Sequence, residues 1–224
     1  MSVKDVIRVS AIISGVSGAV ILFGAIYPIA SYESDSRQRY PRLISPLAGE
    51  ATYPYVSRVD YTKASNWFVG DNRAQTGASY ESRVTHYNIS IPSLGIKDAE
   101  VAIGGEDLSE NLIHFAGTNM PGKIGNSVIF GHSILPQYFN PKDYLSIFST
   151  LPTIDVGAEI FVDYDGISYK YRVQDVFEVL PTELHVLDQQ VNGSYLSLVT
   201  CVPPGHPLKP RRLVVKAVII PPGV

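Results

Sequence analysis

One long stretch of the chain, from Val9 to Tyr32, contains no charged residue and is mostly apolar. At about 1.5 Å per helical residue it can cross a bilayer core of roughly 30 Å, so we interpret it as a transmembrane helix. A buried core helix would show a polar face, which this stretch lacks. A cleaved signal peptide is the remaining alternative, although its apolar region usually has only about 7–15 residues. Lys4 and Arg8 precede the stretch, which predicts a single-pass cell-membrane protein with a cytoplasmic N-terminus and its remaining residues outside.

The next segment, residues 33–79, is polar, interrupted by Pro and Gly, and shows no sustained periodicity. It is interpreted as a stalk or linker after an anchor of residues 1–32. Trp67 beside Phe68 indicates that part of it packs on the following domain.

From Tyr80 onward the pattern changes to short apolar or alternating runs between turn residues, which are typical of β-strands. The runs cover residues 83–92, 99–105, 126–132, 158–180, 194–201 and 211–220. Asp165-Gly166 between two alternating runs predicts a hairpin. Two short helices are expected at residues 107–113 and 141–151. The pattern favours a closed barrel or a sandwich, mainly β and mostly antiparallel, over residues 80–224.

Composition further restricts the class of protein that the sequence can encode. A chain of 224 residues with 45% hydrophobic residues is suited to one core domain plus accessory segments. Its net charge of −3, without a basic stripe, argues against a nucleic-acid partner. The carboxylates Asp98, Glu100, Glu106 and Asp107 do not form a recognisable oxygen cage, and no His/Cys spacing indicates a metal. We expect no cofactor and no metal.

The chain has a single cysteine, Cys201, at the end of the apolar run YLSLVTC and before VPPGHP, which cannot continue a central strand. An extracytoplasmic domain that used cysteine structurally would pair it. The cysteine is therefore either a buried inert thiol or a nucleophile at the end of a strand.

A reactive thiolate needs a base or a positive charge nearby. Among the five histidines, His132 also ends a strand run, NSVIFGH, whereas His206 lies in a proline-rich loop and His114 follows a predicted helix. His86 and His185 have ordinary surface or strand interpretations. Arg211 and Arg212 open the last strand, where a guanidinium could donate to an oxyanion.

The order of a histidine, a cysteine in TC at the end of an apolar strand, and an arginine before the last strand resembles the sortases. These are membrane-anchored cysteine transpeptidases of bacterial surfaces, and the resemblance, over residues 81–220, is nearest to classes C, D and E. The family's T-L-x-T-C signature corresponds to S-L-V-T-C here, with Ser197 in place of the first threonine. The resemblance implies a closed sortase-type barrel of about eight strands with short helices. It matches the nucleophile to Cys201, the histidine to His132, the arginine to Arg212 and an oxyanion-supporting threonine to Thr200. Alternation along a strand lets only one of Arg211 and Arg212 face the cysteine, and Arg212 is preferred.

The resemblance also implies the reaction: cleavage of an LPxTG-like C-terminal sorting signal of exported proteins through a thioester. The acyl group then passes to an amine of the cell wall or of a pilin-like subunit. A membrane-anchored cysteine peptidase and a non-catalytic anchored β-domain remain alternatives. Residues 53–79, which contain Trp67, are a candidate lid over Cys201.

Overall fold

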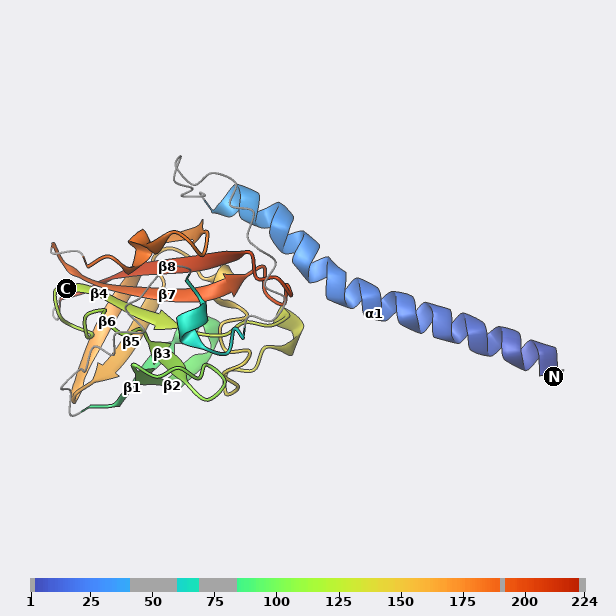
Figure 1. Ribbon diagram of the computed structural model, residues 1–224, viewed down its shortest axis with the longest axis horizontal. Coiled ribbons are helices and arrows are strands. Elements are labelled where there is room, and N and C mark those ends of the chain that lie inside the picture. Colours follow the sequence, from blue (N-terminus) through green and yellow to red (C-terminus); the bar gives the residue numbers. More distant parts are fainter. Residues whose placement is uncertain (1–2, 41–59, 69–83, 190–191, 222–224) are drawn as a thin grey trace.

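The fold is an eight-stranded closed barrel with a long N-terminal helix that projects from it (Figure 1). The computed structural model describes residues 3–40, 60–68, 84–189 and 192–221. The helix is α1 (Val3–Arg39). The strands are β1 (His86–Ile91), β2 (Ile96–Ile103), β3 (Leu112–His114), β4 (Gly125–Phe130), β5 (Glu159–Tyr164), β6 (Ile167–Val179), β7 (Ser194–Val202) and β8 (Arg211–Ile219).

The strands follow the order β1-β2-β3-β4-β7-β8-β6-β5, and pairing of β5 with β1 closes the barrel. All pairs are antiparallel except β2 with β3 and β4 with β7. The predicted mainly-β closed barrel is therefore confirmed. The Asp165-Gly166 turn joins β5 to β6 with both residues at positive φ, 52° and 75°, as a tight hairpin turn requires.

Neither predicted short helix forms as an α-helix. The Asp107 carboxylate accepts hydrogen bonds from the backbone N–H and the hydroxyl of Ser109, which holds a turn, and Leu112–His114 pairs with β2 as β3 instead. In residues 141–151, Ser146, Ser149 and Leu151 each donate to the carbonyl three residues earlier. The segment is therefore a series of tight turns that leads into a short 3₁₀ helix, Leu151–Thr153.

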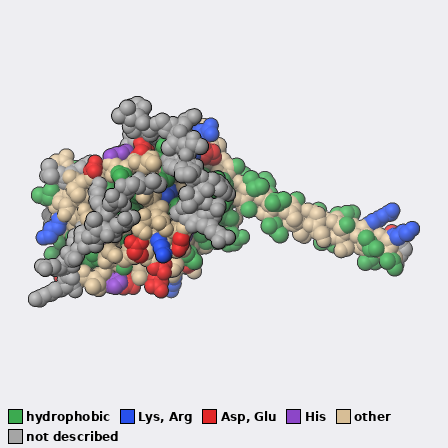
Figure 2. Space-filling model, viewed as in Figure 1, with side chains coloured by type: hydrophobic (Ala, Val, Ile, Leu, Met, Phe, Trp, Pro, Cys, Tyr) green, Lys and Arg blue, Asp and Glu red, His purple; other side chains and the backbone are tan. Residues whose placement is uncertain are grey.

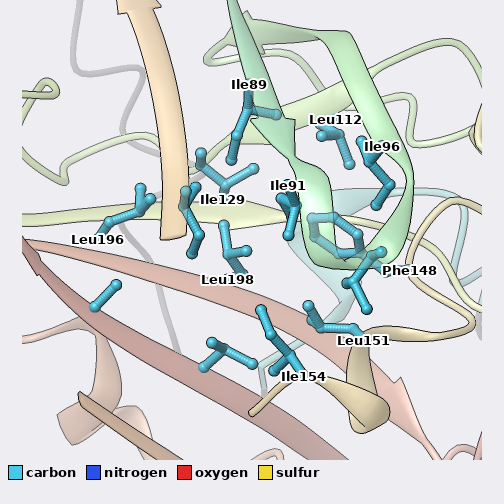
Figure 3. Packing of buried hydrophobic residues seen from close by; sticks show 14 of the residues in the cluster. Ile89, Ile91, Ile96, Leu112, Ile129, Phe148, Leu151, Ile154, Leu196 and Leu198 are labelled. Atoms are coloured by element: carbon cyan, nitrogen blue, oxygen red, sulfur yellow. The ribbon is translucent and has the colours of Figure 1, made fainter. Parts of the chain in front are cut away.

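The barrel interior is filled by hydrophobic side chains, most of them aliphatic (Figure 3). Ile89, Ile129, Leu196 and Leu198 are fully buried there. A second cluster covers the opposite face of β4, β7 and β8, because successive residues of a strand point to opposite faces. It contains Phe130, Val199, Cys201 and Val214.

Helix α1 is long and apolar enough to cross a membrane. Its projecting surface carries hydrophobic and other uncharged side chains, with Lys and Arg gathered at the far tip (Figure 2). The sequence predicted a linker after Tyr32, whereas the helix continues to Arg39. At about 1.5 Å per residue, its 37 residues exceed the bilayer core. The boundaries at residues 32 and 79 stay a prediction.

The end of α1 docks on the barrel. Tyr40 is buried in the interior cluster and its hydroxyl donates to the Pro152 carbonyl. The Tyr32 hydroxyl donates to Glu178 Oε1 at 2.7 Å. Arg211 of β8 links α1 to β6. It pairs with Glu33 of α1 and, through Nε at 2.7 Å, with Oε2 of the buried Glu178 of β6. These contacts fix the helix end against β6 and β8.

Candidate active site

The parallel pairing of β4 with β7 brings the histidine and the cysteine to the same end of the barrel. Phe130 is paired with Val199, and His132 and Cys201 each lie two residues beyond that pair. The Gly131 N–H donates to the Val199 carbonyl at 3.1 Å, which continues the ladder towards His132. Both side chains are buried, with exposed fractions of 6% for His132 and 1% for Cys201.

The antiparallel pairing of β7 with β8 places Arg212 directly opposite Cys201, and Arg211 opposite Val202. Directly opposite residues of an antiparallel pair share a face. Arg212 is 1% exposed on the face of Cys201, whereas Arg211 is held by Glu33 and Glu178 at the docked end of α1. The geometry therefore favours Arg212 as the arginine of the site.

Thr200 lies between Val199 and Cys201, and its hydroxyl donates to the Gly131 carbonyl at 2.8 Å. The Ser133 hydroxyl donates to the Cys201 carbonyl at 2.7 Å. One bond is donated from β7 to the chain just after β4, and the other is donated from the chain just after β4 to β7. They hold the backbone of the histidine and the cysteine together, and the Thr200 hydroxyl is used in this bond rather than turned towards the thiol.

Gly131 permits this close approach. A Cβ at Gly131 would lie 2.3 Å from the Phe148 ring and 2.6 Å from the Leu112 side chain, closer than side chains pack. The backbone that carries His132 thus lies directly on the core.

Residues 60–68 cover the face that contains Cys201. Trp67 is fully buried and stacks on Phe130 with ring centroids 5.1 Å apart. Backbone bonds fasten this segment to the β2–β3 connection: Ala64 N–H donates to the Glu106 carbonyl and Leu108 N–H to the Thr62 carbonyl. Residues 53–59 and 69–79 of the candidate lid lie outside the described residues.

Residues 60–68 also contact the guanidinium of Arg212. Arg212 Nε donates to the Trp67 carbonyl at 3.0 Å, and Nη1 to the Lys209 carbonyl at 2.8 Å. The Tyr61 and Trp67 rings lie 5.5 Å and 5.6 Å from its Cζ. A backbone carbonyl of the covering segment thus occupies one of the N–H donors of the guanidinium, that of Nε.

Replacing Trp67 with alanine is expected to expose Cys201. Loss of a fully buried tryptophan costs about 3–5 kcal/mol of packing, and about 1.4 kcal/mol changes an equilibrium tenfold. We expect iodoacetamide to alkylate Cys201 at least about tenfold faster in Trp67→Ala, measured by intact mass. Trp67→Phe keeps a ring on Phe130 and serves as the control. An alkylation rate unchanged in Trp67→Ala would show that residues 60–68 do not control access.

His132 is held as a neutral imidazole. Burial lowers its pKa to about 4, and the ammonium of Lys209 acts in the same direction. Lys209 Nζ lies 3.4 Å from Nδ1 and 3.4 Å from Nε2 of the ring. The Ser133 backbone N–H donates to Nδ1 at 2.9 Å, and a nitrogen that accepts this bond carries no proton. Lys209 gave no signal in the sequence, because it lies in the loop after β7 and meets His132 only in the fold.

The other histidines lie apart from this arrangement. His114 is fully buried and bonds to the Tyr87 hydroxyl at 2.8 Å, and burial lowers its pKa to about 4. His206 accepts the Leu208 N–H in the loop after β7. Within the described residues, no group of three or more His, Cys, Asp or Glu side chains is arranged to hold a metal ion.

Comparisons with known proteins identify the family and the fold. The family model for the sortase domain matches residues 89–220. A Clostridium perfringens sortase D5 transpeptidase has a TM-score of 0.52 at 25% identity, with 67% of this chain and 88% of that chain covered. Sortase C-1 from Actinomyces oris gives 0.52 at 28% identity, covering 60% and 73%. Streptococcus agalactiae sortase C1, at 24% identity and 0.52 over 60% and 67%, supports the fold. No curated protein sequence matched the chain.

This fold is the one adopted by a class of barrel-shaped cysteine transpeptidases. The family match covers more than half of the chain, and the chain belongs to the sortase family.

Proposed function

We propose that this protein is a sortase that cleaves an LPxTG-like C-terminal sorting signal of exported proteins and joins the new C-terminus to an amine. The acceptor amine belongs to the cell wall or to a pilin-like subunit. The observation that carries the proposal is the meeting of Cys201, Arg212 and His132 at one end of β4, β7 and β8. A transpeptidase among the similar structures supports it.

In the first step the Cys201 thiolate attacks the carbonyl carbon of the scissile peptide bond. The oxygen gains negative charge, and Arg212, released from the Trp67 carbonyl, donates to it. The C–N bond then breaks, and the imidazolium of His132 gives its proton to the leaving amine. The products are a thioester on Cys201, a free peptide amine and a neutral His132.

In the second step the acceptor amine attacks the thioester carbonyl. His132 takes a proton from the attacking nitrogen, the C–S bond breaks, and the thiolate of Cys201 leaves as the new amide forms. Thr200 supports the oxyanion indirectly in this proposal, because its bond to the Gly131 carbonyl fixes β7 relative to β4.

We further propose that α1 anchors the enzyme in the cell membrane with the N-terminus in the cytoplasm and the barrel outside. Residues 1–32 are then the anchor, 33–79 the connecting segment and 80–224 the catalytic domain. Protease added to intact cells should digest the barrel while leaving the tip around Lys4 protected. Digestion of the barrel only after lysis would contradict this orientation.

The function is tested with the full chain in detergent micelles and a library of LPxTG-type peptides, with and without an added primary amine. Intact mass should show an acyl adduct on Cys201 that the amine converts into an amide product. An adduct released only to water would indicate a cysteine peptidase. No adduct with any peptide, together with a Cys201 that stays unreactive after residues 60–68 are displaced, would indicate a non-catalytic β-domain.

A further inference from the structure

Lys209 contacts both the catalytic histidine and the segment that covers the site. It is half-buried in the loop between β7 and β8, and its Nζ lies 3.4 Å from both ring nitrogens of His132. On its other side, Nζ lies 5.1 Å from the centroid of the Tyr61 ring, in residues 60–68. One ammonium thus joins a catalytic group to the cover.

The backbone of Lys209 is constrained to make this contact. Its φ is +43°, a region that residues with a Cβ adopt infrequently. Its carbonyl accepts from Arg212 Nη1 at 2.8 Å, and its N–H donates to the His206 carbonyl at 3.2 Å. Arg212 therefore holds the Lys209 backbone in this conformation.

Two features lower the pKa of His132 in this arrangement: its burial and the Lys209 ammonium. The Ser133 N–H donates to Nδ1, so that nitrogen carries no proton. The ammonium is joined to residues 60–68 by a direct contact, since the Tyr61 ring lies on its other side.

We propose that Lys209 is a positioning residue of the transfer reaction: it holds His132 as the neutral imidazole while residues 60–68 cover the site, and it leaves His132 when Tyr61 moves away. His132 can then accept the thiol proton of Cys201, which forms the thiolate and the imidazolium together. The inference deepens the proposed transpeptidase function by linking removal of the cover to activation of the catalytic pair.

The charges around the pair support this assignment. His132 is also faced by Asp60 of the covering segment and Asp143 of the loop after β4, which both favour the imidazolium. Asp60 is fully exposed, so solvent screens it. Lys209 itself is faced by Cys201, Arg212 and Asp60, and burial is the main cause that lowers its pKa. The Lys209 ammonium lies 3.4 Å from His132 Nδ1, in direct contact with the ring.

The test is an NMR titration of the histidine Cε1–H signals in the full chain in detergent micelles, with His132 assigned from a His132→Gln sample. Lys209→Met removes the charge and keeps an unbranched chain. We expect it to raise the pKa of His132 by about one unit or more, the effect of a unit charge at this distance in a partly screened site. The pKa should still stay below the ordinary value, because burial persists.

Two charge controls and one variant of the cover complete the design. Lys209→Arg should keep the wild-type titration. So should Lys216→Met, which removes a lysine that also lies over a tyrosine ring, Tyr195, at 4.6 Å from Nζ to the centroid. Tyr61→Ala removes the ring that holds the ammonium. It should shift the pKa of His132 in the same direction as Lys209→Met does.

A wild-type titration of His132 in folded Lys209→Met overturns the proposal. A shift in Lys209→Met without one in Tyr61→Ala overturns the link to the cover, and Tyr61→Ala alone decides that link if Lys209→Met does not fold. The titration needs no peptide, so the absence of any peptide turnover would refute the proposed function and leave this measurement valid.

Discussion

Cys201→Ala should form no covalent adduct with any sorting peptide, and transfer to an amine should fall by about ten-thousandfold or more. The reason is that alanine offers no atom to attack the carbonyl, and the remaining groups of such a site provide only residual catalysis. Intact mass and product formation measure the two effects.

Cys201→Ser is the matched variant, since it keeps a nucleophilic atom that is far less acidic than a thiol. It should be almost as inactive. The free energy of unfolding of both variants should lie within about 1–2 kcal/mol of the wild-type value, because the change of side-chain volume is small. An adduct that persists in Cys201→Ala would place the nucleophile elsewhere.

The two adjacent arginines should give opposite phenotypes. Arg212→Ala should slow acylation about 100–1000-fold, the usual cost of removing one oxyanion donor, because Arg212 lies opposite Cys201. Arg211→Ala should change acylation by less than tenfold but lower the free energy of unfolding by about 2–4 kcal/mol. It leaves Glu178, which is 1% exposed, without its guanidinium.

Arg212→Lys and Arg211→Lys are the charge-preserving controls. Lysine at 212 cannot reproduce the planar fork that reaches two carbonyls and should restore little activity. Lysine at 211 should recover part of the stability through Glu178. Acylation rates and urea unfolding of all four variants distinguish the arginines, and slow acylation in Arg211→Ala with normal acylation in Arg212→Ala would reverse the assignment.

The barrel was predictable because most strands carry their own signal. Alternation and turn residues located β1, β4 and β7 and the hairpin of β5 and β6. The short strand β3 was missed, since Leu112–His114 obtains its conformation from pairing with β2 and β4 rather than from its own pattern. The residues before it look helical in composition, yet the Asp107 side chain competes for the backbone donors.

The candidate site could be predicted from the sequence where its residues lie at strand ends. Cys201 and His132 end strand runs that are neighbours in the structure. The start of the last strand offered two arginines, and alternation allowed only one of them to face the cysteine. The contacts of Lys209 and Tyr61 could not be predicted, because they join a loop after β7 to a segment far earlier in the chain. The same holds for the pairing of Arg211 with Glu33.

The docked end of α1 also bears on where the proposed chemistry would take place. With α1 in a bilayer, as proposed, the pairing of Arg211 with Glu33 would link the anchor to the barrel, and Arg212 is the next residue in the chain. The proposed reaction centre would then stay close to one height above the membrane. An anchored substrate meets it by diffusion in two dimensions, at a high effective concentration when the spacer before its own anchor matches that height. Under the proposed function, the spacing between the sorting motif and the membrane would then affect how well a substrate is used.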